Sequence, residues 1–117
     1  MPVTRSFEIS TVELESKRVQ LVATPESGAT DTFVLRGFFE AGSGNPPHSH
    51  DHQEVVVVLA GCGRYTIGDD AIEVSAGDVV LVPKGVIHAF EAAENLDAIA
   101  VFAAGTKTFA PDGSEMD

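Results

Sequence analysis

The amino-acid sequence predicts an all-β fold, arranged as a sandwich or a barrel. Short apolar stretches alternate with turn residues through the whole 117-residue chain. No segment shows a sustained helical period bounded by capping residues. Many short strands at spacings of about eight to twelve residues are typical of sandwiches and barrels. The length is that of one domain, so we expect residues 1–117 to form a single domain.

The strands expected in the first half follow from alternating apolar residues. Residues 19–23 and 33–39 show this alternation, so each is predicted as a strand. Residues 42–47 contain two Gly and two Pro, a composition that is predicted to break the strand ladder. Residues 48–60 are predicted as one strand, interrupted or bent near Asp51, because four consecutive valines form its centre.

The second half alternates between turns and short strands. Residues 68–70 read Gly-Asp-Asp, which predicts a hairpin turn between strands at 64–67 and 71–74. A strand at 79–82 is predicted to end at Pro83, which has no N–H for the ladder. The remaining expectations are bends at 61–63 and 75–78, strands at 86–90 and 98–102, a short helical turn at 92–95, and a loosely held acidic tail from residue 110.

The charge balance argues against two classes of partner. Lys and Arg together number 7 and Asp and Glu 18, which gives a net charge of −11. Such a surface repels phosphate backbones and anionic lipid, so we expect neither nucleic acid nor membrane as a partner. Cys62 is the single cysteine, so no intrachain disulfide can form. No apolar run approaches the roughly 20 residues of a membrane span, and we expect a cytoplasmic protein.

A cluster of histidines and one glutamate is the most informative feature. His48, His50, His52 and Glu54 are spaced by two residues. Residues two apart on a strand project to the same face, so these side chains can point together into a barrel. Imidazole and carboxylate are ligands for divalent transition metals, and burying them unpaired costs several kcal/mol. A solvated turn is the alternative interpretation. If His48, His50 and Glu54 supply three ligands, a fourth must come from elsewhere in the chain. The one histidine outside this cluster is His88.

Two spaced motifs resemble those of the cupin superfamily. The first is a Gly, five residues, His-x-His, three or four residues, Glu, six residues and a Gly. It is matched by Gly42, His48, His50, Glu54 and Gly61. The second is a Gly, five residues, Pro-x-Gly, two residues, His, three residues and an Asn. It is matched by Gly77, Pro83, Gly85 and His88, with Ala92 in place of the Asn. That last position is not a metal ligand in the family.

The resemblance implies a jelly-roll β-barrel of two packed sheets and a metal site inside it. The ligands would be His48, His50, Glu54 and His88. They would hold one divalent ion of iron, manganese, nickel, copper or zinc, with further positions for water or substrate. His52 falls in the turn of the first motif, so we expect it to be solvated. The resemblance also favours a homodimer, which would cover exposed edge strands.

The sequence allows two interpretations for each of three other residues near the motifs. Phe90 shares the face of His88 and either lines the pocket or belongs to the core. Tyr65 is either a hydrogen-bond donor in the pocket or part of the barrel wall, and we favour the wall. Cys62 lies between two glycines, where an ordinary turn cysteine is expected rather than a reactive thiol.

The fold does not specify the reaction, so three functional hypotheses stand. The first is a metal-dependent dioxygenase that acts on a neutral enolisable or phenolic small molecule, since basic residues are few. The second is a non-redox metal-dependent isomerase, lyase or cyclase. The third is a binding or sensor protein for small molecules without catalysis. We favour an enzyme over a binder, and among enzymes the dioxygenase.

Overall fold

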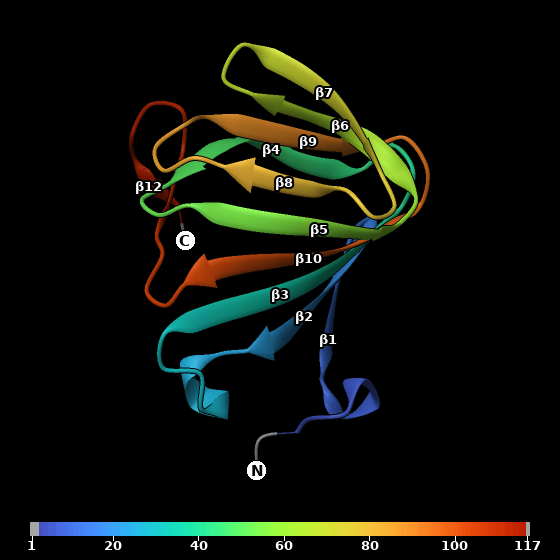
Figure 1. Ribbon diagram of the computed structural model, residues 1–117, viewed down its shortest axis with the longest axis vertical. Helices are drawn as coiled ribbons and strands as arrows, with labels where there is room; N and C mark the ends of the chain where they lie inside the picture. The colour runs from blue at the N-terminus through green and yellow to red at the C-terminus, as the bar shows by residue number, and fades with distance from the viewer. Residues whose placement is uncertain (1–2, 117) are drawn as a thin grey trace.

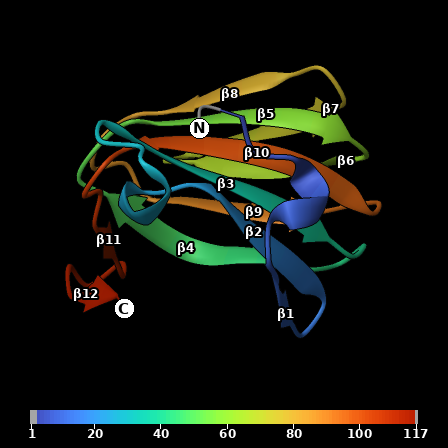
Figure 2. The same ribbon diagram turned by 90° about the horizontal axis from the view of Figure 1, so that it is seen from below.

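Two antiparallel six-stranded sheets pack face to face and form a jelly-roll barrel (Figures 1 and 2). The computed structural model describes residues 3–116. The first sheet has the order β1 (Thr11–Leu14), β2 (Lys17–Ala23), β3 (Thr32–Phe39), β10 (Leu96–Ala103), β5 (Glu54–Ala60) and β8 (Val79–Val82). The second has the order β12 (Glu115–Met116), β11 (Thr108–Phe109), β4 (Gly44–His50), β9 (His88–Ala92), β6 (Cys62–Ile67) and β7 (Asp70–Ser75). The predicted all-β jelly-roll class is confirmed.

The core lies between the sheets and is built from alternating residues. On β5, Val56 and Val58 point inward and are buried, while Val55 and Val57 face the other side. Burial of each such valine contributes about 1.5–3 kcal/mol, which is what holds the two sheets together. The buried apolar cluster consists of Val56, Val58, Tyr65, Val74, Val80, Val82, Phe90, Ala92, Leu96 and Ala98.

The single bent strand expected at 48–60 is in fact two strands in different sheets. β4 ends at His50 in the second sheet, and β5 begins at Glu54 in the first. The residues between them form the turn that connects the second sheet to the first (Figure 1). The inward direction of Glu54 therefore comes from two sheets facing each other, and the parity of one continuous strand does not account for it.

The break predicted at 42–47 is wrong, because β4 already begins at Gly44 and runs through both prolines. Its register against β9 shifts between Asn45 and His48. At such a bulge the ladder does not need every N–H, so Pro46 and Pro47 fit without losing a paired donor.

The hairpin between β6 and β7 is confirmed, with Ile67 paired to Asp70 across the turn. The helical turn expected at 92–95 is absent from that segment, because Ala92 ends β9 and a bend follows. Short 3-10 helices occur instead at Ser6–Glu8 (η1) and Pro25–Ser27 (η2).

The segment after residue 110 includes a paired strand. β12 pairs with β11, and β11 pairs in turn with β4, so this part of the chain continues the second sheet. Within residues 3–116, no helix has the length and apolar character needed to cross a membrane.

Candidate metal centre

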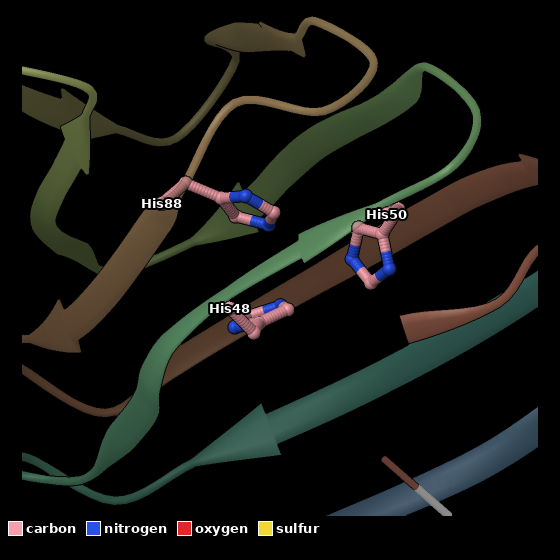
Figure 3. A group of neighbouring side chains, drawn as sticks. All are labelled: His48, His50 and His88. Carbon is pink, nitrogen blue, oxygen red and sulfur yellow. The ribbon is translucent and has the colours of Figure 1, made fainter. Parts of the chain in front are cut away.

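Three histidines from two neighbouring strands turn their rings into one space inside the barrel (Figure 3). His48 and His50 lie on β4, and His88 begins β9, directly paired with His48. The ring centroids are 4.2 Å apart for His48 and His88, 4.8 Å for His48 and His50, and 5.1 Å for His50 and His88. One nitrogen of each ring lies within 4.8 Å of the others, so the three are positioned as potential ligands of one metal ion.

Each ring is held through its Nδ1 atom. The Nδ1 of His48 donates to the carbonyl oxygen of Pro46 at 2.6 Å, and that of His88 donates to the carbonyl of Val86 at 3.0 Å. Because a carbonyl can only accept, the neutral forms of both rings carry a lone pair on Nε2. His50 Nδ1 lies 3.0 Å from the Thr108 hydroxyl oxygen. Partners of this kind orient imidazoles for metal binding.

The Nε2 atoms of His50 and His88 have no hydrogen-bond partner within residues 3–116. The two residues are only 6% and 3% exposed, and the polar group that faces their Nε2 atoms is the Glu54 carboxylate, which is itself an acceptor when ionised. Leaving a buried polar atom unpaired costs about 1–3 kcal/mol. A divalent ion at the meeting point of the rings would satisfy both atoms, so the residues present fit the metal that the motifs predict.

Glu54 approaches this group from the opposite sheet. Its Oε1 atom lies 3.2 Å from the Nε2 atom of His88 and 3.6 Å from that of His50. Burial alone raises the pKa of this carboxyl, but the two imidazoles outweigh it and lower the pKa to about 2. Burial also lowers the pKa of His48, which favours its neutral form. The predicted ligands His48, His50, Glu54 and His88 thus lie close together. An ionised Glu54 and a neutral His48 are the forms that can coordinate a metal.

The site opens into a cavity of about 530 Å³. His48, His50 and Glu54 are on its lining, and most of the remaining wall is apolar, including Phe33 and Phe102. Polar lining groups other than the candidate ligands are Lys17, Asn45, Tyr65, Thr106 and Thr108.

Tyr65 is both a wall residue and a lining residue of this cavity. Its ring is buried against Phe90, at a centroid distance of 4.9 Å. Burial and the nearby Glu54 charge raise the pKa of its phenol, so the hydroxyl stays protonated. The favoured interpretation of Tyr65 as a wall residue agrees with this burial, and its role as a hydrogen-bond donor in the pocket stays a prediction.

The other residues singled out in the sequence lie away from the cavity lining. Phe90 is 6% exposed, packs between Phe39 and Tyr65, and belongs to the core. His52 is exposed and pairs with Asp51 at 2.8 Å, as expected for a solvated turn residue. The Cys62 thiol contacts the Glu94 carboxylate, which raises its pKa. A raised pKa disfavours the reactive thiolate.

Sequence reasoning missed two residues that belong to the site. Thr108, which holds His50, is 58 positions away in the chain and meets it only because β11 pairs with β4. Lys17 enters the cavity wall from β2. A lone Thr or Lys carries no spacing pattern, so only the sheet order could reveal them.

The fold and the converging imidazoles define a small jelly-roll barrel with a candidate metal centre, and a family comparison agrees. Residues 36–103 match the model of the cupin domain. The chain belongs to the cupin family. It is also 36% identical over 64 residues to an uncharacterized protein of Streptomyces coelicolor, a match that spans 54% of this chain and 61% of that protein.

Solved structures share the fold at low sequence identity. The polyketide cyclase RemF from Streptomyces resistomycificus has a TM-score of 0.81 and 16% identity, over 91% of this chain and 81% of that one. A single-site mutant of salicylate 1,2-dioxygenase from Pseudoaminobacter salicylatoxidans has a TM-score of 0.69 and 16% identity, over 75% of this chain and 26% of that one. These likenesses concern the fold.

Proposed function

We propose that this protein is a metal-dependent enzyme for small molecules, and specifically a dioxygenase for a phenolic or enolisable substrate. The ligands are His48, His50, Glu54 and His88. The observation that carries the proposal is the pair of buried Nε2 atoms on His50 and His88, which lack a hydrogen-bond partner within residues 3–116 and face the Glu54 carboxylate. They lie beside a cavity large enough for a small molecule, at about 530 Å³.

The chain's own residues would prepare a substrate for reaction. A bound divalent transition metal supplies a Lewis acid and, where it is redox-active, a route for electrons to dioxygen. Phe33 and Phe102 offer flat apolar surface for a ring, and the surrounding wall keeps water away from it. The protonated Tyr65 hydroxyl can donate a hydrogen bond to a substrate oxygen. The apolar wall supports a substrate whose body is uncharged, as the scarcity of basic residues suggests.

Tyr65 also favours the second hypothesis, a non-redox isomerase, lyase or cyclase. Such reactions move protons rather than electrons, and a buried phenol beside the ligand Glu54 is a suitable donor. One similar structure is a polyketide cyclase and another a dioxygenase, so the fold serves both kinds of chemistry.

The metal itself is tested by analysis of the bound ion in the purified protein. We expect His48→Ala and His88→Ala to weaken metal binding by more than about tenfold, since even outer-shell partners are worth about 10- to 100-fold. His52→Ala is the matched control, because it removes an imidazole from the same turn region but not from the cavity. Retention of the parent's metal content by both ligand variants would contradict the site.

The reaction class is tested by oxygen uptake. Iron- or nickel-loaded protein is offered a panel of polyphenols and diketones, and we expect uptake that His88→Ala abolishes. Turnover of a keto acid or sugar acid without uptake would favour the isomerase, lyase or cyclase hypothesis. Tight binding without turnover of any compound would favour a binding or sensor protein.

A further inference from the structure

Lys17 places a positive charge on the wall of the metal cavity. It is the one Lys or Arg among the described residues that line this cavity, and it is half-buried. Its Nζ atom donates to the side-chain oxygen of Asn45 at 2.9 Å and lies 3.4 Å from the carbonyl oxygen of Gly44. The ammonium is therefore held in a fixed position by two neutral acceptors.

The charge of Lys17 has no carboxylate partner within residues 3–116. An ammonium group has three donors, and Asn45 and Gly44 take two of them. One donor and the whole charge are left for a ligand. A hydrogen bond in which both partners are charged is roughly twice as strong as a neutral one, so a carboxylate is the best complement.

The partner of Lys17 lies on the same strand as His48. Asn45 precedes His48 by three residues on β4, so their backbones are on the order of 10 Å apart at the usual strand rise, or somewhat less because of the bulge between them. An aromatic ring with two adjacent oxygens on one edge and a carboxylate on the opposite edge bridges a gap of this order. The apolar residues that line the same cavity include Val19, Leu35 and Phe39.

Electrostatics place the carboxylate on the histidine side of Lys17. Lys17 also lines a second cavity of about 570 Å³, together with Arg18 and the three acidic residues Glu13, Glu40 and Asp97. Acidic groups outnumber basic ones on that lining, so it favours an anion less than the metal cavity does. In the metal cavity, Glu54 is the one acidic lining residue described, and it would cancel only part of the charge of a divalent ion. The metal cavity would thus be cationic at both ends, although the protein as a whole is acidic.

We infer that Lys17 is a carboxylate-binding residue, and that the substrate is a phenolic or enolisable carboxylic acid with its carboxylate at Lys17. This inference rests on the proposed function and refines its substrate class. It replaces the expectation of a neutral substrate, which came from the small number of basic residues, with an apolar body that carries one anionic group.

The test compares two compounds that share a dihydroxyphenyl ring, one with a charged carboxylate and the other with an uncharged methyl ester. Cobalt-loaded protein is titrated without oxygen with 3,4-dihydroxybenzoate and with its methyl ester, and visible absorption reports contact with the metal. We expect the parent to bind the acid about tenfold more tightly, the size expected for a charge-assisted hydrogen bond. Lys17→Met should remove this preference while the affinity for the ester stays within about twofold, and Lys17→Arg should restore most of it.

Lys107→Met is the matched control, since Lys107 is an exposed lysine paired with Glu115 outside the cavity lining. It should keep the preference of the parent. Equal affinity of the parent for the acid and the ester would overturn the inference and leave the proposed function standing. The same conclusion would follow if Lys17→Met lowered the affinity for the acid and for the ester by the same factor. If the metal-loaded parent binds neither compound, the proposed phenolic substrate fails and this inference fails with it.

Discussion

At the scale of single residues, Glu54 couples its ionisation to folding. The carboxyl is buried, and its pKa in the folded protein is about 2, below the ordinary value of 4.5. As the pH falls, the unfolded chain therefore takes up a proton first. The stabilisation from Glu54 is complete above the ordinary pKa and is lost as the pH falls through the folded value. The lowered pKa of His48 acts in the same direction, beginning below its ordinary value of 6.5.

We expect the metal-free protein to lose on the order of 3 kcal/mol of unfolding free energy through Glu54 as the pH falls from about 5 to about 2. Glu54→Gln removes the titrating group but keeps a side chain of the same shape, so its stability should fall less over this range. Urea denaturation at several pH values measures both proteins. Parallel pH profiles for the two would show that Glu54 does not carry the effect.

At the scale of strands, the sequence predicted the features that depend on residues close together in the chain. The positions of β3, β8 and the β6–β7 hairpin follow from apolar residues and turn residues that lie next to each other in the chain. The run of four valines predicted the centre of β5 but not its start at Glu54. The two sequence motifs likewise placed His48, His50, Glu54 and His88 in one group. The assignment of β4 and β5 to different sheets could not be predicted, because nothing in residues 51–53 distinguishes a bend from a crossing.

The short strand β11 was not predicted from the sequence, although it contributes to the candidate metal site. Two residues cannot show an alternating pattern, and β11 is held by pairing with β4 on one side and β12 on the other. It pairs Thr108 with His50 and so supplies the hydroxyl at the Nδ1 atom of that ring.

We expect Thr108→Val to weaken metal binding by about tenfold, the lower end of what an outer-shell partner contributes. Valine has nearly the same shape, so β11 should remain paired and thermal unfolding should change little. Thr106→Val is the control, because its hydroxyl lines the same cavity but donates to the Ala103 carbonyl rather than to a ligand ring. Isothermal titration with zinc compares the variants, and equal affinities would contradict a role for Thr108.

At the scale of the whole molecule, the outer face of the first sheet is unusually apolar. Val79 and Leu81 on β8 are 60% and 57% exposed, and Leu59 on neighbouring β5 is 41% exposed. β8 is also an edge strand of its sheet and pairs only with β5 among the described strands. Exposed apolar patches and open edges are typical of surfaces that bind another chain.

We therefore predict a homodimer through this face, as the family resemblance also suggests. Light scattering should give about twice the chain mass of 12.3 kDa. Leu81→Glu should produce a monomer, because a charge would be buried at the interface. Ile72→Glu is the control, since Ile72 is similarly exposed but lies on β7 of the other sheet. A monomeric parent would contradict the prediction.

The candidate ligands and most of the cavity wall belong to different strands, and this has an evolutionary consequence. The candidate ligands come from β4, β5 and β9, whereas β2, β3 and β10 supply much of the wall. Substitutions at wall positions such as Lys17, Leu35 or Ala100 can reshape the cavity without moving a ligand. The barrel can thus acquire a new substrate by a few changes on one side. Relatives that share the candidate ligands can therefore diverge in the molecules that they bind.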